Sequence, residues 1–319
     1  MNKEQLLKFY EQGYRDFTGV NLGGADLSGV MLINVNLTGA NLIGANLSRA
    51  FLTKSNLSQA TLNWANLSFA KMSETKLECA DLTKANLSGA FMVKSELSRA
   101  KLSGANLANS NLRASNLLGA NLSGAKLQKV NLRQANLKQV NFNWANLKQG
   151  RLTGANLDHV SLTGVDLSQS YLIDVDLSNT DLSSINLSQA KLTRANLSNS
   201  DLNCANLEEA QLRNTNFTNA NLRNVNLQDA QLKGGNLRQA NLAKANLINA
   251  DLRQASLVQA DLTDADLTDA QLKDVDFNLA ILHNTLLDAD CIKTNNHSFT
   301  QQPETASENY GVVPQIQIA

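Results

Sequence analysis

A large apolar residue occupies every fifth position of the chain from Phe17 to Leu287. The series has 55 consecutive sites, of which 49 are Leu. A small residue, most often Ala, lies two positions before each site. Asn or Asp stands between the two in most repeats, so a typical repeat reads Ala-Asn-Leu-Ser-Gly, as at 120–124. A period of five matches neither a helix nor a long alternating strand, so the pattern predicts that neither element extends beyond one repeat.

The small residue and the Leu of each repeat are two residues apart, so a short extended segment points both to the same face. The other positions are rich in Gly, Asn, Ser and Asp, the residues that turns require. A chain that bends once in every repeat and keeps one face inward coils into a solenoid. Leu157, for example, is expected in the core and Ser168 on the outside.

The spacing of unusual residues indicates how many repeats make one coil. Large apolar residues are rare just before the Leu position, and the four examples Met31, Phe51, Phe91 and Tyr171 are separated by four, eight and sixteen repeats. Residues one coil apart share an environment, so these separations favour a four-sided coil in which each side is one repeat. The series then predicts about 14 coils and, at the spacing of paired strands, a length of about 65 Å.

The repeat A-(D/N)-L-x-x resembles that of the pentapeptide-repeat proteins, and it continues without insertion from residue 16 to about residue 290. The resemblance implies an all-β fold, a right-handed quadrilateral β-helix in which Leu and Ala face the core. The opening residues 6–17 are similar to the start of cyanobacterial members, including a regulator of heterocyst differentiation.

The two ends of the chain depart from the repeat. Apolar residues at near-helical spacing within 3–12 predict a helix, and residues 1–15 are expected to cap the first coil, because a solenoid end exposes apolar core and unpaired backbone groups. The solenoid is expected to occupy 16–292. Residues 293–319 are polar and contain both Pro residues of the chain, which is typical of a flexible tail.

Charge and hydropathy narrow the functional classes. Lys and Arg number 28 and equal Asp and Glu, so nucleic acid is not an expected partner. Charge is instead segregated along the chain, because residues 91–160 carry ten basic and two acidic residues, whereas 251–290 carry two basic and nine acidic ones. The sequence shows neither a transmembrane run nor a secretory signal, so we expect a cytoplasmic protein that does not associate with membranes.

Residues that could carry chemistry are scattered. The three Cys lie far apart and predict free thiols, and the three His lack partners at metal-ligand spacing. Asp158 and His159 lie near several Ser, but Ser recurs throughout the repeat, so a catalytic triad is not predicted. A core filled with Leu leaves no room for a cofactor. We therefore expect no enzyme activity, no metal and no cofactor.

The candidate protein-binding surface comprises outward positions on one predicted side: Met31, Ile33, Phe51, Phe91 and Val93. Contiguous exposed apolar groups often mark interfaces, so the first hypothesis is a non-enzymatic regulatory scaffold that binds another protein. Two alternatives stay open for these residues: they are isolated surface groups, or the amino-terminal helix or the tail covers them.

A different functional class is a DNA mimic that binds a type II topoisomerase, as some pentapeptide-repeat proteins do. The basic middle of this chain argues against mimicry, because such mimics are acidic along their length. The identity of the partner and the oligomeric state do not follow from the sequence.

Overall fold

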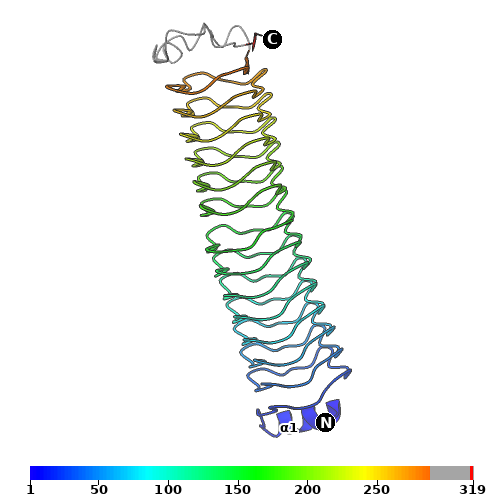
Figure 1. Cartoon of the computed structure of the whole chain (residues 1–319). Coiled ribbons are helices and arrows are strands. Elements are labelled where there is room, and N and C mark those ends of the chain that lie inside the picture. The colour runs from blue at the N-terminus through cyan, green and yellow to red at the C-terminus, as the bar shows by residue number, and fades with distance from the viewer. Residues whose placement is uncertain (288–316, 319) are drawn as a thin grey trace. The chain divides into compact units, whose positions relative to one another are not determined.

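The computed structural model of the protein describes residues 1–287 and 317–318 (Figure 1). They belong to two compact units, Met1–Asp166 (unit 1) and Leu167–Ala319 (unit 2). Both units are built from one local conformation that recurs in every five-residue repeat. Each repeat consists of a residue in a β-bridge, the large apolar residue, two turn residues and the small residue.

Every repeat closes with a tight turn. In most repeats the backbone N–H of the small residue donates to the carbonyl of the large apolar residue, as from Ala60 to Leu57 at 3.1 Å. At Val35 it donates instead to the Ser55 hydroxyl at 3.2 Å. The residue before the small one takes a left-handed backbone, with φ of 60° at Gln59. That conformation costs a residue other than Gly about 1 kcal/mol. The N–H of Gln59 also donates to Glu78 of the next coil at 2.9 Å, so coil stacking offsets the cost.

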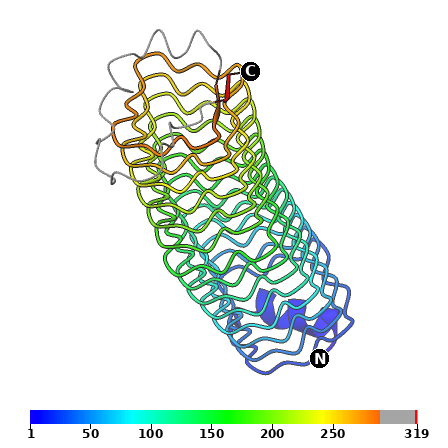
Figure 2. The ribbon, with the colours of Figure 1, turned by 45° about the horizontal axis from the view of Figure 1, so that its top comes forward.

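Successive coils are joined by parallel bridges between residues four repeats apart, such as Met31 and Phe51 in unit 1 or Asn206 and Asn226 in unit 2. This confirms the predicted coil of four repeats. Figure 2 shows the coils of each unit stacked on one another. We number the four sides by their first repeats, which are 16–20 (side 1), 21–25 (side 2), 26–30 (side 3) and 31–35 (side 4). Each side recurs once in every coil.

The core of each unit is a stack of leucines and small residues. Leu107 in unit 1 and Leu227 in unit 2 are both fully buried, and Leu157 is 4% exposed, as predicted. A fully buried Leu contributes about 1.5 to 3 kcal/mol, so every coil adds several such terms. Where Ser or Thr replaces the small Ala, its hydroxyl in most cases donates to a backbone carbonyl, as from Ser55 to Leu32 at 2.7 Å. The buried hydroxyl of Ser170 is an exception, because it has no partner among the described residues.

The prediction that Ser168 points into solvent is wrong, because this residue is only 5% exposed. Ala243 and Val258 occupy the same position of the repeat, directly after the Leu, and are also buried. All three side chains are short. Length alone does not bury this position, because the equally short Ala108 is only half-buried there.

The Asn residues before the Leu form ladders that run from coil to coil. The side-chain oxygen of Asn66 accepts from the backbone N–H of Ser68 at 3.2 Å, which fixes the turn. Its amide donates to Asn46 at 3.1 Å, and the amide of Asn86 donates to Asn66 at 3.2 Å. Each such Asn therefore links its own turn to the coils before and after it.

Helix α1 (Lys3–Glu11) lies at the amino-terminal end of unit 1. Asn2 and Gln5 form a capping box at its start. Leu6 is fully buried, and the Tyr10 hydroxyl donates to the Ile33 carbonyl of the first coil at 3.5 Å. Among the described residues, no helix has the length and hydropathy needed to cross a bilayer.

In unit 2, strand β1 (Leu286–Leu287) pairs in parallel with β2 (Gln317–Ile318), with Leu286 opposite Gln317. The predicted end of the solenoid at residue 292 lies outside the described residues. The same holds for nearly all of the predicted tail at 293–319, of which only β2 is described.

Candidate protein-interaction surface

The candidate residues lie on side 4 of unit 1. Bridges join Met31 to Phe51, Phe51 to Lys71 and Lys71 to Phe91, so these four residues form one column. Neighbouring members are one coil apart, or about 4.8 Å at strand spacing. Ile33 lies two residues beyond Met31 on the same side, and Val93 lies two beyond Phe91. The structure therefore places all five predicted residues on one side. We call Met31, Ile33, Phe51, Phe91 and Val93 the apolar strip.

The apolar strip is open to solvent at its largest side chains. Met31 is 55% exposed, Phe51 is 40% exposed and Phe91 is 42% exposed, whereas Ile33 and Val93 are half-buried. The column position precedes the core Leu, so its side chains point away from the core. Helix α1 reaches the first coil through Tyr10 but leaves Phe51 and Phe91 exposed.

Cationic side chains lie among the apolar ones. The Lys71 ammonium is 3.6 Å from the centroid of the Phe91 ring, a cation–π contact that uses the one residue interrupting the column. Lys54 lies 4.0 Å from Glu74, and both side chains are more than half exposed. The apolar strip is thus bordered by polar groups, as in the rim of a protein interface.

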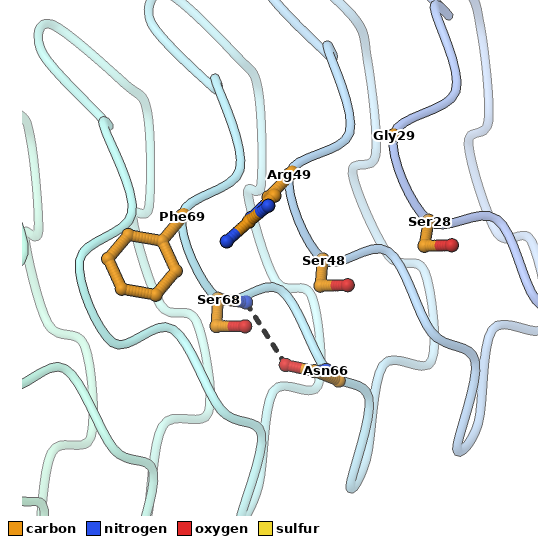
Figure 3. Close-up of a pocket in the computed structure, with 7 residues that line it drawn as sticks. All are labelled: Ser28, Gly29, Ser48, Arg49, Asn66, Ser68 and Phe69. Atoms are coloured by element: carbon orange, nitrogen blue, oxygen red, sulfur yellow. Dashed lines mark hydrogen bonds between the residues drawn. The ribbon is translucent and has the colours of Figure 1, made fainter.

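A shallow pocket adjoins the apolar strip at the corner between sides 3 and 4. Figure 3 shows its lining, in which Ser28, Ser48 and Ser68 stack on side 3 while Gly29, Arg49 and Phe69 follow one another along the corner. Arg49 extends toward Phe69 and has no acidic partner among the described residues.

The Phe69 ring packs against the backbone of Gly89, the residue one coil later. A Cβ atom at Gly89 would lie 2.6 Å from the ring, so only Gly leaves room for it there. Trp144 covers Gly164 in the same way, where a Cβ would lie 2.3 Å from the indole. Phe69 is 54% exposed and only two residues from Lys71, so it extends the apolar surface around the corner.

The repeat pattern directs Phe69 outward, but neither Phe69 nor Arg49 is among the five candidate residues predicted from the sequence. A signal for Phe69 is present, because Gly89 follows it by one coil length, as Gly164 follows Trp144. No comparable signal identifies Arg49, because the direction of a long flexible side chain depends on the coils around it.

The groups considered for chemistry lie apart from this surface. Asp158 contacts His159 and lies 2.7 Å from Lys138 on side 1, and all three side chains are well exposed. The hydrogen bond from Lys138 is the main cause that lowers the pKa of Asp158. Cys79 and Cys204 are exposed free thiols, and Cys291 lies outside the described residues. The described part of the chain contains no group of His, Cys, Asp or Glu that could hold a metal.

Two solved structures similar to this chain are pentapeptide-repeat proteins from cyanobacteria. HetL, a pentapeptide-repeat protein of the cyanobacterium Nostoc sp. strain PCC 7120 involved in heterocyst differentiation regulation, is 30% identical over 86% of this chain and 96% of its own, with a TM-score of 0.33. Rfr23 from the cyanobacterium Cyanothece 51142 is 24% identical over 50% of this chain and 93% of its own, with a TM-score of 0.18.

A third similar structure is QnrB1, a plasmid-mediated fluoroquinolone resistance protein. It is 15% identical over 60% of this chain and 86% of its own, with a TM-score of 0.30. Comparison with curated proteins finds no match.

The family described as pentapeptide repeats matches this sequence in overlapping segments, from 16–53 at the first to 245–284 at the last. These segments cover most of the coils described above. Members of the family form right-handed quadrilateral β-helices. The chain therefore belongs to the pentapeptide-repeat family.

Proposed function

We propose that this protein is a non-enzymatic scaffold that binds another protein through the apolar strip on side 4 of unit 1. The observation that carries the proposal is the exposure of Phe51 and Phe91 in one column, two coils apart. Elsewhere in this column and its equivalents, Asn commonly occupies the position and bonds to its neighbours. Phe makes no such ladder, so these two residues contribute little to coil stacking and leave apolar area in water.

The surface also has the composition of an interface. Aromatic anchors carry much of the binding energy at protein interfaces, and polar groups surround them. Here Phe51, Phe69 and Phe91 are the anchors, while Lys71, Lys54 and Glu74 lie beside them. A flat wall of this kind offers no enclosed site for a small substrate, which supports recognition rather than catalysis.

Affinity capture tests the proposal. Intact protein and a Phe51→Ser/Phe91→Ser variant are used as baits on cell extract of the source organism. Partners that bind the intact protein are expected to be recovered at least tenfold less by the variant. The matched control is Trp64→Ser/Trp144→Ser, which removes two exposed aromatic residues from side 2 and is expected to retain the partners.

Thermal unfolding must accompany the capture, because only folded variants are informative. Phe51 and Phe91 are 40% and 42% exposed, so each replacement removes some covered apolar area and is expected to cost about 1 kcal/mol of the free energy of unfolding. Equal recovery by the intact protein and the Phe51→Ser/Phe91→Ser variant would remove the apolar strip from the proposal.

A second candidate function, DNA mimicry at a type II topoisomerase, is favoured by the acidic exterior of unit 2. Sides 1 to 3 of this unit carry eleven acidic residues and three basic ones between residues 171 and 287. A gyrase supercoiling assay separates the two functions. Inhibition at submicromolar protein would support mimicry, whereas a scaffold acting through unit 1 leaves supercoiling unchanged.

A further inference from the structure

Positive charge in unit 1 is concentrated on side 4. The seven repeats of this side, from 31–35 to 151–155, contain six Lys or Arg residues and a single acidic residue, Glu74. The other three sides together carry nine basic and seven acidic residues between residues 16 and 166. The basic residues of side 4 are Lys54, Lys71, Lys94, Arg113, Arg133 and Arg151. Side 4 thus has a net charge of plus five, and the other sides are close to balance.

Several of these cations are available to a ligand. Lys94, Arg113 and Arg133 are exposed, and none has an acidic partner within residues 1–287. Glu74, the one acidic residue of the side, lies 4.0 Å from Lys54. Neighbouring cations in such a row repel one another, and a bound segment with acidic side chains reduces this repulsion.

Apolar and basic groups follow one another along the side. The apolar strip occupies the coils of residues 31 to 93, and Arg113, Arg133 and Arg151 occupy the next three. Six coil steps separate Met31 from Arg151, which is about 29 Å at strand spacing. A helix of about 19 residues has the same length.

We propose that side 4 of unit 1 binds an acidic protein segment about 29 Å long, with apolar side chains at the end that meets the apolar strip and carboxylates at the end that meets the arginines. This inference rests on the proposed scaffold function and specifies its partner. A protein segment fits better than nucleic acid, because the exposed apolar side chains Met31, Phe51 and Phe91 occupy the first coils of the side and offer nothing to a phosphate backbone. Arginine forks suit carboxylates, and aromatic anchors suit Leu or Phe.

A designed peptide tests the proposal. The probe is a fluorescein-labelled synthetic helix of about 19 residues, with Phe and Leu in its first third and Glu in the remainder. Its binding to the full chain is followed by fluorescence anisotropy. We expect binding that weakens with added salt, and at least tenfold weaker binding of the same peptide with Gln in place of Glu.

Variants show which groups take part. Arg113→Glu/Arg133→Glu and Phe51→Ser/Phe91→Ser are each expected to weaken peptide binding at least tenfold. The matched control is Lys126→Glu/Lys148→Glu, which reverses two exposed charges on side 3 at a similar height and is expected to stay within twofold of the intact protein. Circular dichroism establishes that each variant is folded.

Three results would overturn the proposal. They are absence of peptide binding, equal loss in the side-3 control, and competition by duplex DNA at concentrations below the peptide's own Kd. The affinity capture described above keeps the scaffold function separate. Partners lost by Phe51→Ser/Phe91→Ser but kept by Arg113→Glu/Arg133→Glu would leave the scaffold standing and remove the acidic partner.

Discussion

Side 4 of unit 1 and side 4 of unit 2 have the same backbone conformation but differ in how their charged side chains are paired. In unit 1, Arg113 and Arg133 have no acidic partner among the described residues. In unit 2, the Nε and Nη2 atoms of Arg194 each donate to one carboxylate oxygen of Asp174 in the preceding coil, both at 2.7 Å. Arg253 contacts Asp251, two residues before it, in the same bidentate way.

The aromatic residues of the two sides differ as well. Tyr171 is the single aromatic residue on side 4 of unit 2, and the Lys191 ammonium lies 4.5 Å from its ring. Phe51 and Phe91 in unit 1 are two exposed rings in one column. Side 4 of unit 2 still carries six basic and three acidic residues, so it is not neutral. The comparison shows that one coil geometry supports both a side with two bidentate ion pairs and a side on which cations without an acidic partner lie beside exposed apolar area. Function in this fold therefore depends on what the outward positions hold.

If the two units differ only in their outward-facing residues, the same substitution in the core should lower the free energy of unfolding equally in both. Leu107→Ala and Leu227→Ala each empty a fully buried site and are expected to cost about 2 to 5 kcal/mol. Urea unfolding followed by circular dichroism measures the effect as a shift of midpoint. The control Leu118→Ala makes the same change at an outward, half-buried position and should cost much less. Equal losses at Leu107 and Leu118 would refute the inward and outward assignment.

Removing one Asn from a ladder is expected to lower the free energy of unfolding by a smaller amount than a core substitution, and by the same amount in both units. Asn66→Ala and Asn226→Ala each remove one turn bond and two bonds to neighbouring coils, at an expected cost of about 1 to 2 kcal/mol. Asn66→Asp keeps the acceptor for the Ser68 N–H but loses the donor to Asn46, so it should recover part of the loss at neutral pH. A large effect in one unit alone would show that the coils are not equivalent.

The smallest expected change in the free energy of unfolding comes from breaking one of the bidentate Arg–Asp pairs on side 4 of unit 2. Hydrogen bonds from Arg253 are the main cause that lowers the pKa of Asp251, whose side chain is 12% exposed. A lowered pKa in the folded state adds stability above the unfolded pKa of about 3.9, and this stability is lost as pH falls through the folded value. Asp251→Asn should therefore cost about 1 kcal/mol at pH 7 and nothing once the carboxyl is protonated in both states.

The control for this pH dependence is Asp274→Asn, which removes a carboxylate from the same side without breaking an ion pair among the described residues. Unfolding midpoints for both variants are compared between neutral and acidic pH. A loss for Asp251→Asn that persists unchanged at low pH would show that the ion pair is not its source.

The sequence period was enough to predict the coil length, the inward Leu and Ala positions, and the side that carries Phe51 and Phe91. These features depend only on which residues recur at intervals of one repeat and of four repeats. The burial of Ser168 does not follow from its place in the repeat, and the pocket of Arg49 and Phe69 depends instead on side chains from successive coils. The bidentate pair of Arg194 with Asp174 has the same origin, because a rotamer and not the period decides whether the two groups meet.

The four-sided coil also limits how such a chain can change its length during evolution. Insertion of one five-residue repeat keeps every Leu and Ala inward, so the core survives. Every later residue, however, moves to the next side, and a column such as Phe51, Lys71 and Phe91 is divided between two sides. Only the gain or loss of four repeats together preserves both the core and the columns. A lineage that needs its binding side must grow by whole coils, whereas one that needs only a stable solenoid is free to grow by single repeats.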